Sequence, residues 1–218
     1  NYPKAVELLS KLESRYPFGR WAQQAQIEIA WAHYKDGERA LALSAIDRFL
    51  RLHPEHPALD YALYLKGLIN FNEQQGLIAW LGRQDLAERD LQAARESFDT
   101  FKQLITRFPE SKYAPDAEAR MTYLVASMAR GEMLIARYYF QRGAYVAAAN
   151  RAQEVVRKYD RAPAVEDALA ILVHSYDKLG MTELRDDARR VLDRNFPNSE
   201  AMVRVTASDD RRWWQVWR

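Results

Sequence analysis

The sequence predicts an all-α solenoid of about five helix pairs, because one pattern of residues recurs along the chain. An aromatic residue or histidine precedes a residue that stops a helix at Tyr16-Pro17, His53-Pro54, Phe108-Pro109, Tyr159-Asp160 and Phe196-Pro197. An alanine stands eight positions after each of the first four stops, at Ala25, Ala62, Ala117 and Ala168. In such arrays each pair packs on its neighbours and the molecule presents a long surface, which favours binding over catalysis.

Apolar residues between the stops follow the spacing of one helix face. They recur at steps of three and four at Ala94, Phe98, Phe101, Ile105 and Phe108. A proline after an aromatic residue ends a helix, since it lacks a backbone N–H and clashes with the preceding turn. Pro57 and Pro163 instead stand where a following helix would begin. The expected helices cover residues 3–15, 19–35, 39–52, 57–74, 92–107, 113–140, 145–158, 163–178, 182–195 and 199–207.

The repeat predicts one solenoid domain over residues 1–207 and a separate tail over residues 208–218. The second residues of the stops are 37, 55, 51 and 37 positions apart, so the two longer intervals hold additional residues. The expected units are 1–36, 37–75, 92–140, 141–179 and 180–207, with an insertion at 72–91.

Two segments outside the plain repeat leave alternatives open. The insertion carries several large apolar residues between Leu77 and Leu81, which either pack back onto the solenoid or form an exposed docking loop. The tail carries Trp213, Trp214 and Trp217 beside arginines. It is either a disordered end or an arm that docks onto a groove or a lipid surface.

The composition excludes several functional classes. The chain has 32 Lys and Arg against 30 Asp and Glu, a formal net charge of +2, so no general field for nucleic acid is expected. No stretch approaches the ~18 apolar residues that a membrane span needs. The absence of cysteine excludes disulfides and thiolate catalysis. Asn1 to Lys4 have no signal-peptide pattern and are typical of a helix already under way, so we expect an excised mature region.

No arrangement of reactive residues predicts catalysis. His53 and His56 are three residues apart, but Pro54 and Pro57 interrupt the helix that would place them on one face, so we expect them to cap a turn rather than bind a metal. The chain has no Gly-rich phosphate loop, nucleophile elbow or zinc-protease motif. We therefore expect a protein that is not an enzyme and that uses neither a cofactor nor a metal.

Aromatic, arginine and glutamine side chains along one face are the candidates for partner binding. They are Trp21, Gln23 and Gln24 early in the chain and Tyr138, Arg142, Tyr145 and Arg151 later. Most aromatic residues at helical spacing are core residues, so the two arginines are the stronger candidates. Arg151 in particular stands among alanines, where it has no packing role, and the planar guanidinium suits a partner carboxylate.

The recurring stops resemble those of tetratricopeptide repeats, although the unit here is longer than the usual 34 residues. More specifically, RYPFGRWAQQAQIEIAWAHYK (Arg15–Lys35) and AIDRFLRLHPEHPALDYALYLKGL (Ala45–Leu68) resemble the BamD family, the helical-repeat lipoproteins of the outer-membrane β-barrel assembly machinery. YYFQRGAYVAAANRAQEVVRKY (Tyr138–Tyr159) extends the resemblance. It implies a right-handed superhelical solenoid of tetratricopeptide-like helix pairs.

The resemblance also implies a location and a role. Members lie at the periplasmic face of the outer membrane of Gram-negative bacteria, held by an acylated N-terminal cysteine that this chain lacks. They act as scaffolds that bind POTRA domains of the central barrel subunit, together with other lipoproteins and unfolded outer-membrane proteins. No nucleic-acid partner is implied. The alternative is a tetratricopeptide adaptor or co-chaperone in another cell-envelope complex.

Individual residues carry over from the family to this chain. Arg151 matches the arginine that pairs with the POTRA domain, and Arg142 matches a second interface position, with Tyr138 and Tyr145 nearby. The family's pocket for C-terminal signals of unfolded outer-membrane proteins carries over only at the turn Tyr16–Gly19 and at Gln23 and Gln24. With Trp21 from the residue pattern, the expected pocket residues are Phe18, Trp21, Gln23 and Gln24. The resemblance covers the chain up to about residue 200 and does not extend to the tryptophan-rich tail.

Overall fold

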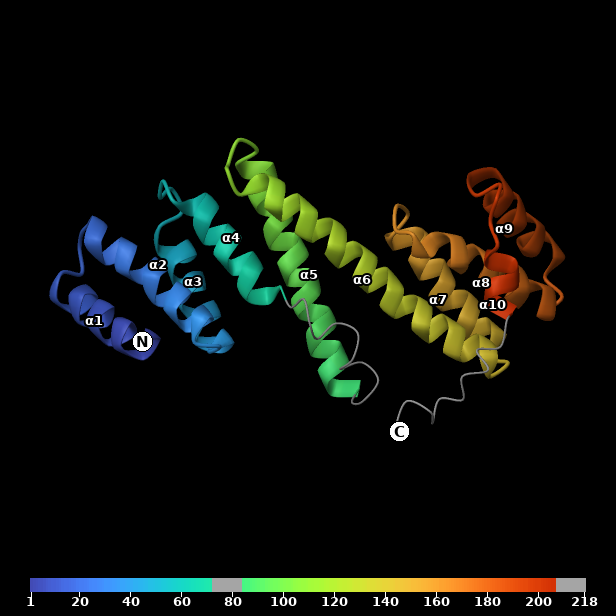
Figure 1. Cartoon of the computed structure of the whole chain (residues 1–218), viewed down its shortest axis with the longest axis horizontal. Helices are drawn as coiled ribbons and strands as arrows, with labels where there is room; N and C mark the ends of the chain where they lie inside the picture. The colour runs from blue at the N-terminus through green and yellow to red at the C-terminus, as the bar shows by residue number, and fades with distance from the viewer. Residues whose placement is uncertain (72–83, 207–218) are drawn as a thin grey trace. The chain divides into compact units, whose positions relative to one another are not determined.

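The computed structural model describes residues 1–71 and 84–206, and side chains except those of residues 84–91. Within this part the chain forms α-helices and no strand (Figure 1). The helices are α1 (Tyr2–Arg15), α2 (Arg20–Lys35), α3 (Arg39–Leu52), α4 (Leu59–Asn70), α5 (Gln84–Arg107), α6 (Ala114–Gln141), α7 (Tyr145–Lys158), α8 (Ala164–Lys178), α9 (Thr182–Asn195) and α10 (Ala201–Thr206).

The chain divides into two compact units, and the division falls within α6. Unit 1 covers Asn1–Leu124, and unit 2 begins at Val125. In unit 1, helices α1 to α5 pack as successive neighbours, and in unit 2, α8 packs against α7, α9 and α10 (Figure 1). The expected all-α fold of consecutively packed helix pairs is therefore confirmed.

Three helices differ from the expected boundaries by more than one residue. The helix expected at 57–74 is shorter, because residues 53–58 form turns: Leu59 N donates to His56 O, and Nδ1 of His56 accepts from Ala58 N, both at 3.0 Å. At its other end the chain leaves the helix at Phe71 with extended backbone. The expectation that His56 caps a turn is confirmed.

The other two differences lie at helix starts. Helix α5 begins at Gln84 instead of 92, inside the expected insertion, since residues 84–90 combine helix-forming residues with acidic residues near an N-terminus. Helix α10 begins at Ala201 instead of 199, because Ser199 caps it: its Oγ accepts from Ala201 N at 3.1 Å. Residues 72–83 and the tail lie outside the described residues, and so do the expectations made for them.

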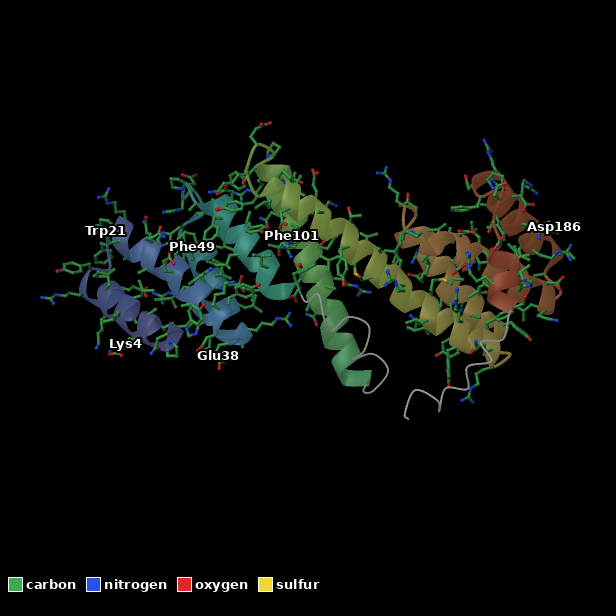
Figure 2. All side chains as sticks on the ribbon, in the orientation of Figure 1. Lys4, Trp21, Glu38, Phe49, Phe101 and Asp186 are labelled. Carbon is green, nitrogen blue, oxygen red and sulfur yellow. The ribbon has the colours of Figure 1, made fainter. Side chains whose placement is uncertain are left out.

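The core of unit 1 is built from small residues that let the helices approach closely. Ala25 and Ala62, two of the recurring alanines, are 1% and 0% exposed. Larger side chains such as Ile46 and Phe49 fill the remaining space and are also fully buried. Figure 2 shows Phe49 and Phe101 among the helices of unit 1, whereas Trp21 lies at the start of α2.

Helices α4 and α5 approach each other closely at Gly67. A Cβ atom built on Gly67 would lie 2.3 Å from the ring of Phe101, which is 0% exposed and cannot move away easily. The buried Oγ of Ser97 also donates to the carbonyl oxygen of Gly67 at 2.9 Å. A side chain at position 67 is therefore incompatible with this packing.

A polar network joins α1, α2 and the turn after α3. Nε2 of the buried Gln26 donates to Glu13 Oε1 at 2.9 Å, and Oε1 of Gln26 lies 3.1 Å from His53 Nε2. Because that amide oxygen can only accept, His53 donates from Nε2. The His53 ring packs on Phe49 at a centroid distance of 5.1 Å. Burial, together with the positive neighbours His56 and Arg48, lowers the pKa of His53.

We expect Gly67→Ala to destabilise the chain by about 1–3 kcal/mol, the usual cost of overpacking a core. The matched control is Gly131→Ala in α6, where an added Cβ would meet nothing within 4 Å. That change should stabilise by about 0.5–1 kcal/mol through helix propensity. Urea unfolding of both variants measures the difference, and a Gly67→Ala variant as stable as the wild type would contradict the packing described.

Stability should fall as the pH drops from neutral through the ordinary imidazole value of about 6.5. The reason is that folding lowers the pKa of His53, so that as the pH falls the unfolded chain binds a proton at a higher pH than the folded chain does. Proton binding therefore stabilises the unfolded state. Thermal unfolding between pH 7.5 and pH 5 measures the slope. His53→Gln should flatten it, and an unchanged slope in that variant would assign the effect to other groups.

Candidate functional site

The end of α6 and the start of α7 carry the partner-binding residues expected in unit 2. The turn between these helices depends on Gly143, whose φ of 75° lies in the left-handed region that favours glycine. Its N–H donates to Phe140 O at 3.0 Å, and Ala144 N donates to Tyr139 O at 3.0 Å. This tight helix ending fixes where α7 starts relative to the last turn of α6.

Tyr138 and Arg142 form an exposed pair at this turn. The Arg142 guanidinium lies over the Tyr138 ring, 5.2 Å from its centroid. The Tyr138 side chain is 51% exposed, and its other neighbour is the Tyr139 ring at 5.8 Å. A cation held over an aromatic face keeps its N–H donors available to a partner.

Tyr145, the fourth expected residue, packs into unit 2 instead. Its ring meets Phe140 edge-on at 5.6 Å, and Phe140 in turn lies 6.0 Å from the His174 ring. His174 contacts α10 through Nε2, which donates to Met202 O at 2.9 Å. Half-buried Tyr145 thus connects the turn to the core, and its geometry is that of a supporting residue.

Arg151 lies on α7 and is held from the neighbouring helix. Its Nη1 donates to Glu132 Oε2 of α6 at 3.2 Å, with the Arg151 side chain 45% exposed and that of Glu132 only 12% exposed. The alanines beside it, Ala148 and Ala152, are fully buried. Arg151 therefore stands on the surface over a layer of small core residues, as its alanine-rich context predicts.

An open cavity of about 410 Å³ lies beside Arg151. It is lined by Tyr139, Ala147, Asn150, Arg151, Gln153 and Glu154. A hydrogen bond to the core of unit 2 holds Gln153 in place, since its Nε2 donates to Oη of the buried Tyr176 at 2.6 Å. A hydrogen bond from Lys158 lowers the pKa of Glu154, so this wall of the cavity is anionic at neutral pH.

The arrangement suits recognition rather than reaction. The cavity offers the Arg151 guanidinium, which can bind a carboxylate, and the amide groups of Asn150 and Gln153, which can hydrogen-bond a peptide backbone. The Glu154 carboxylate adds an acceptor on a further wall. Over residues 1–71 and 92–206, no three metal-ligating side chains come together. Helices long and apolar enough to cross a membrane are also absent from the described part of the chain.

The residues expected for a peptide pocket lie in unit 1, at the α1–α2 turn and the first turns of α2. Phe18 is 96% exposed and Trp21 is 62% exposed, with the Arg20 guanidinium 4.7 Å from the Trp21 ring centroid. Exposed Gln24 donates to Glu28 at 2.8 Å, and Gln23 is half-buried. The turn therefore presents aromatic and amide groups together on the outside of unit 1.

Sequence reasoning missed several residues of the arginine site. Glu132 lies 19 positions before Arg151, and their pairing depends on how α6 packs on α7, for which the sequence has no local signal. Asn150 and Gln153 share the alanine-rich segment with Arg151, and their polar side chains in that segment were the available signal.

Comparisons with known proteins identify related chains. The family model YfiO, described as an outer membrane lipoprotein, matches residues 1–192. A protein of Neisseria meningitidis serogroup B is 52% identical over 217 residues, which is 100% of this chain and 81% of the relative. A Xylella fastidiosa protein is 39% identical over 91% of this chain and 68% of its own length. A Vibrio cholerae protein is 36% identical over 88% of this chain and 79% of its own length. All three are named outer membrane protein assembly factor BamD.

Proposed function

The chain belongs to the YfiO family of outer membrane lipoproteins, and from this premise we propose that it is a non-enzymatic scaffold subunit of an outer-membrane protein assembly complex. Its site in unit 2 binds a POTRA domain of the central barrel subunit. The proposed location is the periplasmic face of the outer membrane of a Gram-negative bacterium, with a lipid anchor as the only membrane attachment. Other lipoproteins of the complex are further partners.

One observation carries the proposal: two arginines with available donors stand on one exposed α6–α7 hairpin. Arg151 is fixed by Glu132 beside an open polar cavity, and Arg142 is fixed over Tyr138. This arrangement supports a partner surface that carries carboxylates. Relatives matched over most of their length are named assembly factors, which supports this complex over the alternative of an adaptor in another cell-envelope complex.

A second candidate function is the reception of C-terminal signals from unfolded outer-membrane proteins at the α1–α2 turn. The observation that favours it is the exposure of Phe18 and Trp21 beside Gln23 and Gln24. An aromatic residue of an extended peptide could stack on Trp21 while the amides bond its backbone.

For this candidate, a photoreactive amino acid placed at Phe18 should crosslink to a peptide that ends in an aromatic residue. Trp21→Ala should weaken crosslinking, because stacking contributes about 0.5–1.5 kcal/mol. The control position is Leu8 of α1, which is also exposed but has no glutamine pair beside it. Equal crosslinking at Leu8 and Phe18 would contradict the assignment.

For the POTRA proposal, Arg151→Glu should abolish capture of this chain by a purified POTRA-domain array. Loss of one member of a desolvated charge pair costs about 2–5 kcal/mol, which is a loss of affinity of about 30-fold or more. A pull-down compares the variant with the wild type, and circular dichroism checks that helicity is unchanged.

The matched control for this experiment is Arg190→Glu on α9. Arg190 is paired with Asp187 and its side chain is 74% exposed, so its charge reversal leaves the α6–α7 hairpin intact. This control should bind like the wild type. Capture of Arg151→Glu at the wild-type level would remove Arg151 from the interface.

A further inference from the structure

We propose that Glu132 is a positioning residue that orients the Arg151 guanidinium for a carboxylate of the partner. The inference rests on the proposed function and deepens it, because it assigns a role to a residue that never meets the partner itself. Arg151 is the residue that touches the partner, and Glu132 determines how it is presented.

The contact leaves most of the guanidinium free. A single hydrogen bond joins Nη1 of Arg151 to Oε2 of Glu132, at 3.2 Å. A guanidinium has five N–H donors in a rigid fork, so the remaining donors can bind a second carboxylate with two parallel hydrogen bonds. Arg151 can therefore serve Glu132 and the partner at the same time.

The two side chains differ in exposure in the way this division of roles requires. The Glu132 side chain is 12% exposed and that of Arg151 is 45% exposed, so the carboxylate lies nearer the core and the cation nearer the solvent. A partner that approaches from solvent meets the arginine and not the glutamate. A carboxylate of the partner can then pair with the outer edge of the guanidinium.

The pair is also unlike the other ion pairs of α7. Arg157 and Lys158 both pair with Glu154, three and four residues before them on the same helix. Arg151 instead pairs across to α6, and its neighbours Ala148 and Ala152 give its side chain no lateral support. Without Glu132, the arginine could rotate into the open cavity of about 410 Å³ beside it.

Two effects of Glu132 on binding oppose each other, and they can be separated. Holding a long side chain in one rotamer favours binding by about 2- to 10-fold, the equivalent of the usual ordering cost. The negative charge of Glu132 repels the partner carboxylate, although the shared cation lies between them. Glutamine at position 132 keeps the acceptor oxygen and removes the charge, whereas leucine removes both.

The test measures the affinity of the full chain for a purified POTRA-domain array by calorimetry. Glu132→Gln should bind within about twofold of the wild type, and Glu132→Leu should bind about 2- to 10-fold more weakly. Arg151→Lys should also lose affinity although the charge is kept, since an ammonium cannot present the same planar fork. A matched control, Asp187→Leu on α9, should leave the affinity unchanged.

A second readout concerns the free chain and does not depend on the partner. NMR relaxation should give a higher order parameter for the Nε–H bond of Arg151 in the wild type than in Glu132→Leu. Glu132→Gln should keep most of this order. A purely structural role for Glu132 would change the unfolding temperature but not this contrast between the Gln and Leu variants.

Distinct outcomes overturn distinct claims. Glu132→Leu binding as well as or better than the wild type would overturn the positioning role, while capture by the wild type would leave the proposed function standing. A wild type that does not bind the array would instead overturn the proposed function. If Glu132→Leu unfolds, Arg151→Lys decides, and wild-type affinity in that variant would overturn the inference.

Discussion

Helices in this chain approach one another closely because alanine and glycine stand where they cross. Ala62, Ala117 and Ala168, which recur eight positions after a stop, are all 0% exposed, and Gly67 has no room for even one further carbon. Close approach brings large side chains such as Phe49 and Phe101 into full burial from the flanking positions. Few long polar side chains fit into such a core, and the buried Gln26 is accommodated by hydrogen bonding to Glu13 and His53. Most of the residues expected to bind a partner therefore lie on the outside of the helix pairs.

Outside the core, the ion pairs divide into two kinds with different consequences. Pairs within one helix, such as Arg189 with Asp193, are exposed at both ends and contribute little to stability. Pairs between elements hold helices in place: Asp167 of α8 receives both Arg137 of α6 and Arg204 of α10. Arg151 with Glu132 belongs to the second kind by its path between helices, and its side chain is 45% exposed, similar to the 47% of Arg204. Arg151 also lines an open polar cavity, which leaves room for a partner to reach its cation.

The sequence predicted most of the fold because the helix stops are local. Residues 39–52, 145–158 and 182–195 agree with α3, α7 and α9 to the residue, since each of these helices lies between a short turn and an aromatic stop. The start of α4 could not be predicted, because it depends on a hydrogen bond of the His56 side chain. In the candidate site, too, only the features that depend on local sequence could be predicted. The exposure of Arg151 could be predicted from its alanine neighbours, whereas the inward packing of Tyr145 and the pairing of Glu132 depend on contacts between helices.

The arginine site shows how one backbone position can determine the geometry of several side chains. Gly143 alone allows α6 to end and α7 to begin within three residues, because its φ of 75° strains any other residue. That short turn places α7 antiparallel and adjacent to the last turns of α6, so Arg151 returns to the level of Glu132. Arg142 lies within reach of Tyr138 because it stands four residues later, at the end of α6. The turn therefore fixes the backbone positions of both arginines on one hairpin, while Tyr138 and Glu132 orient their side chains.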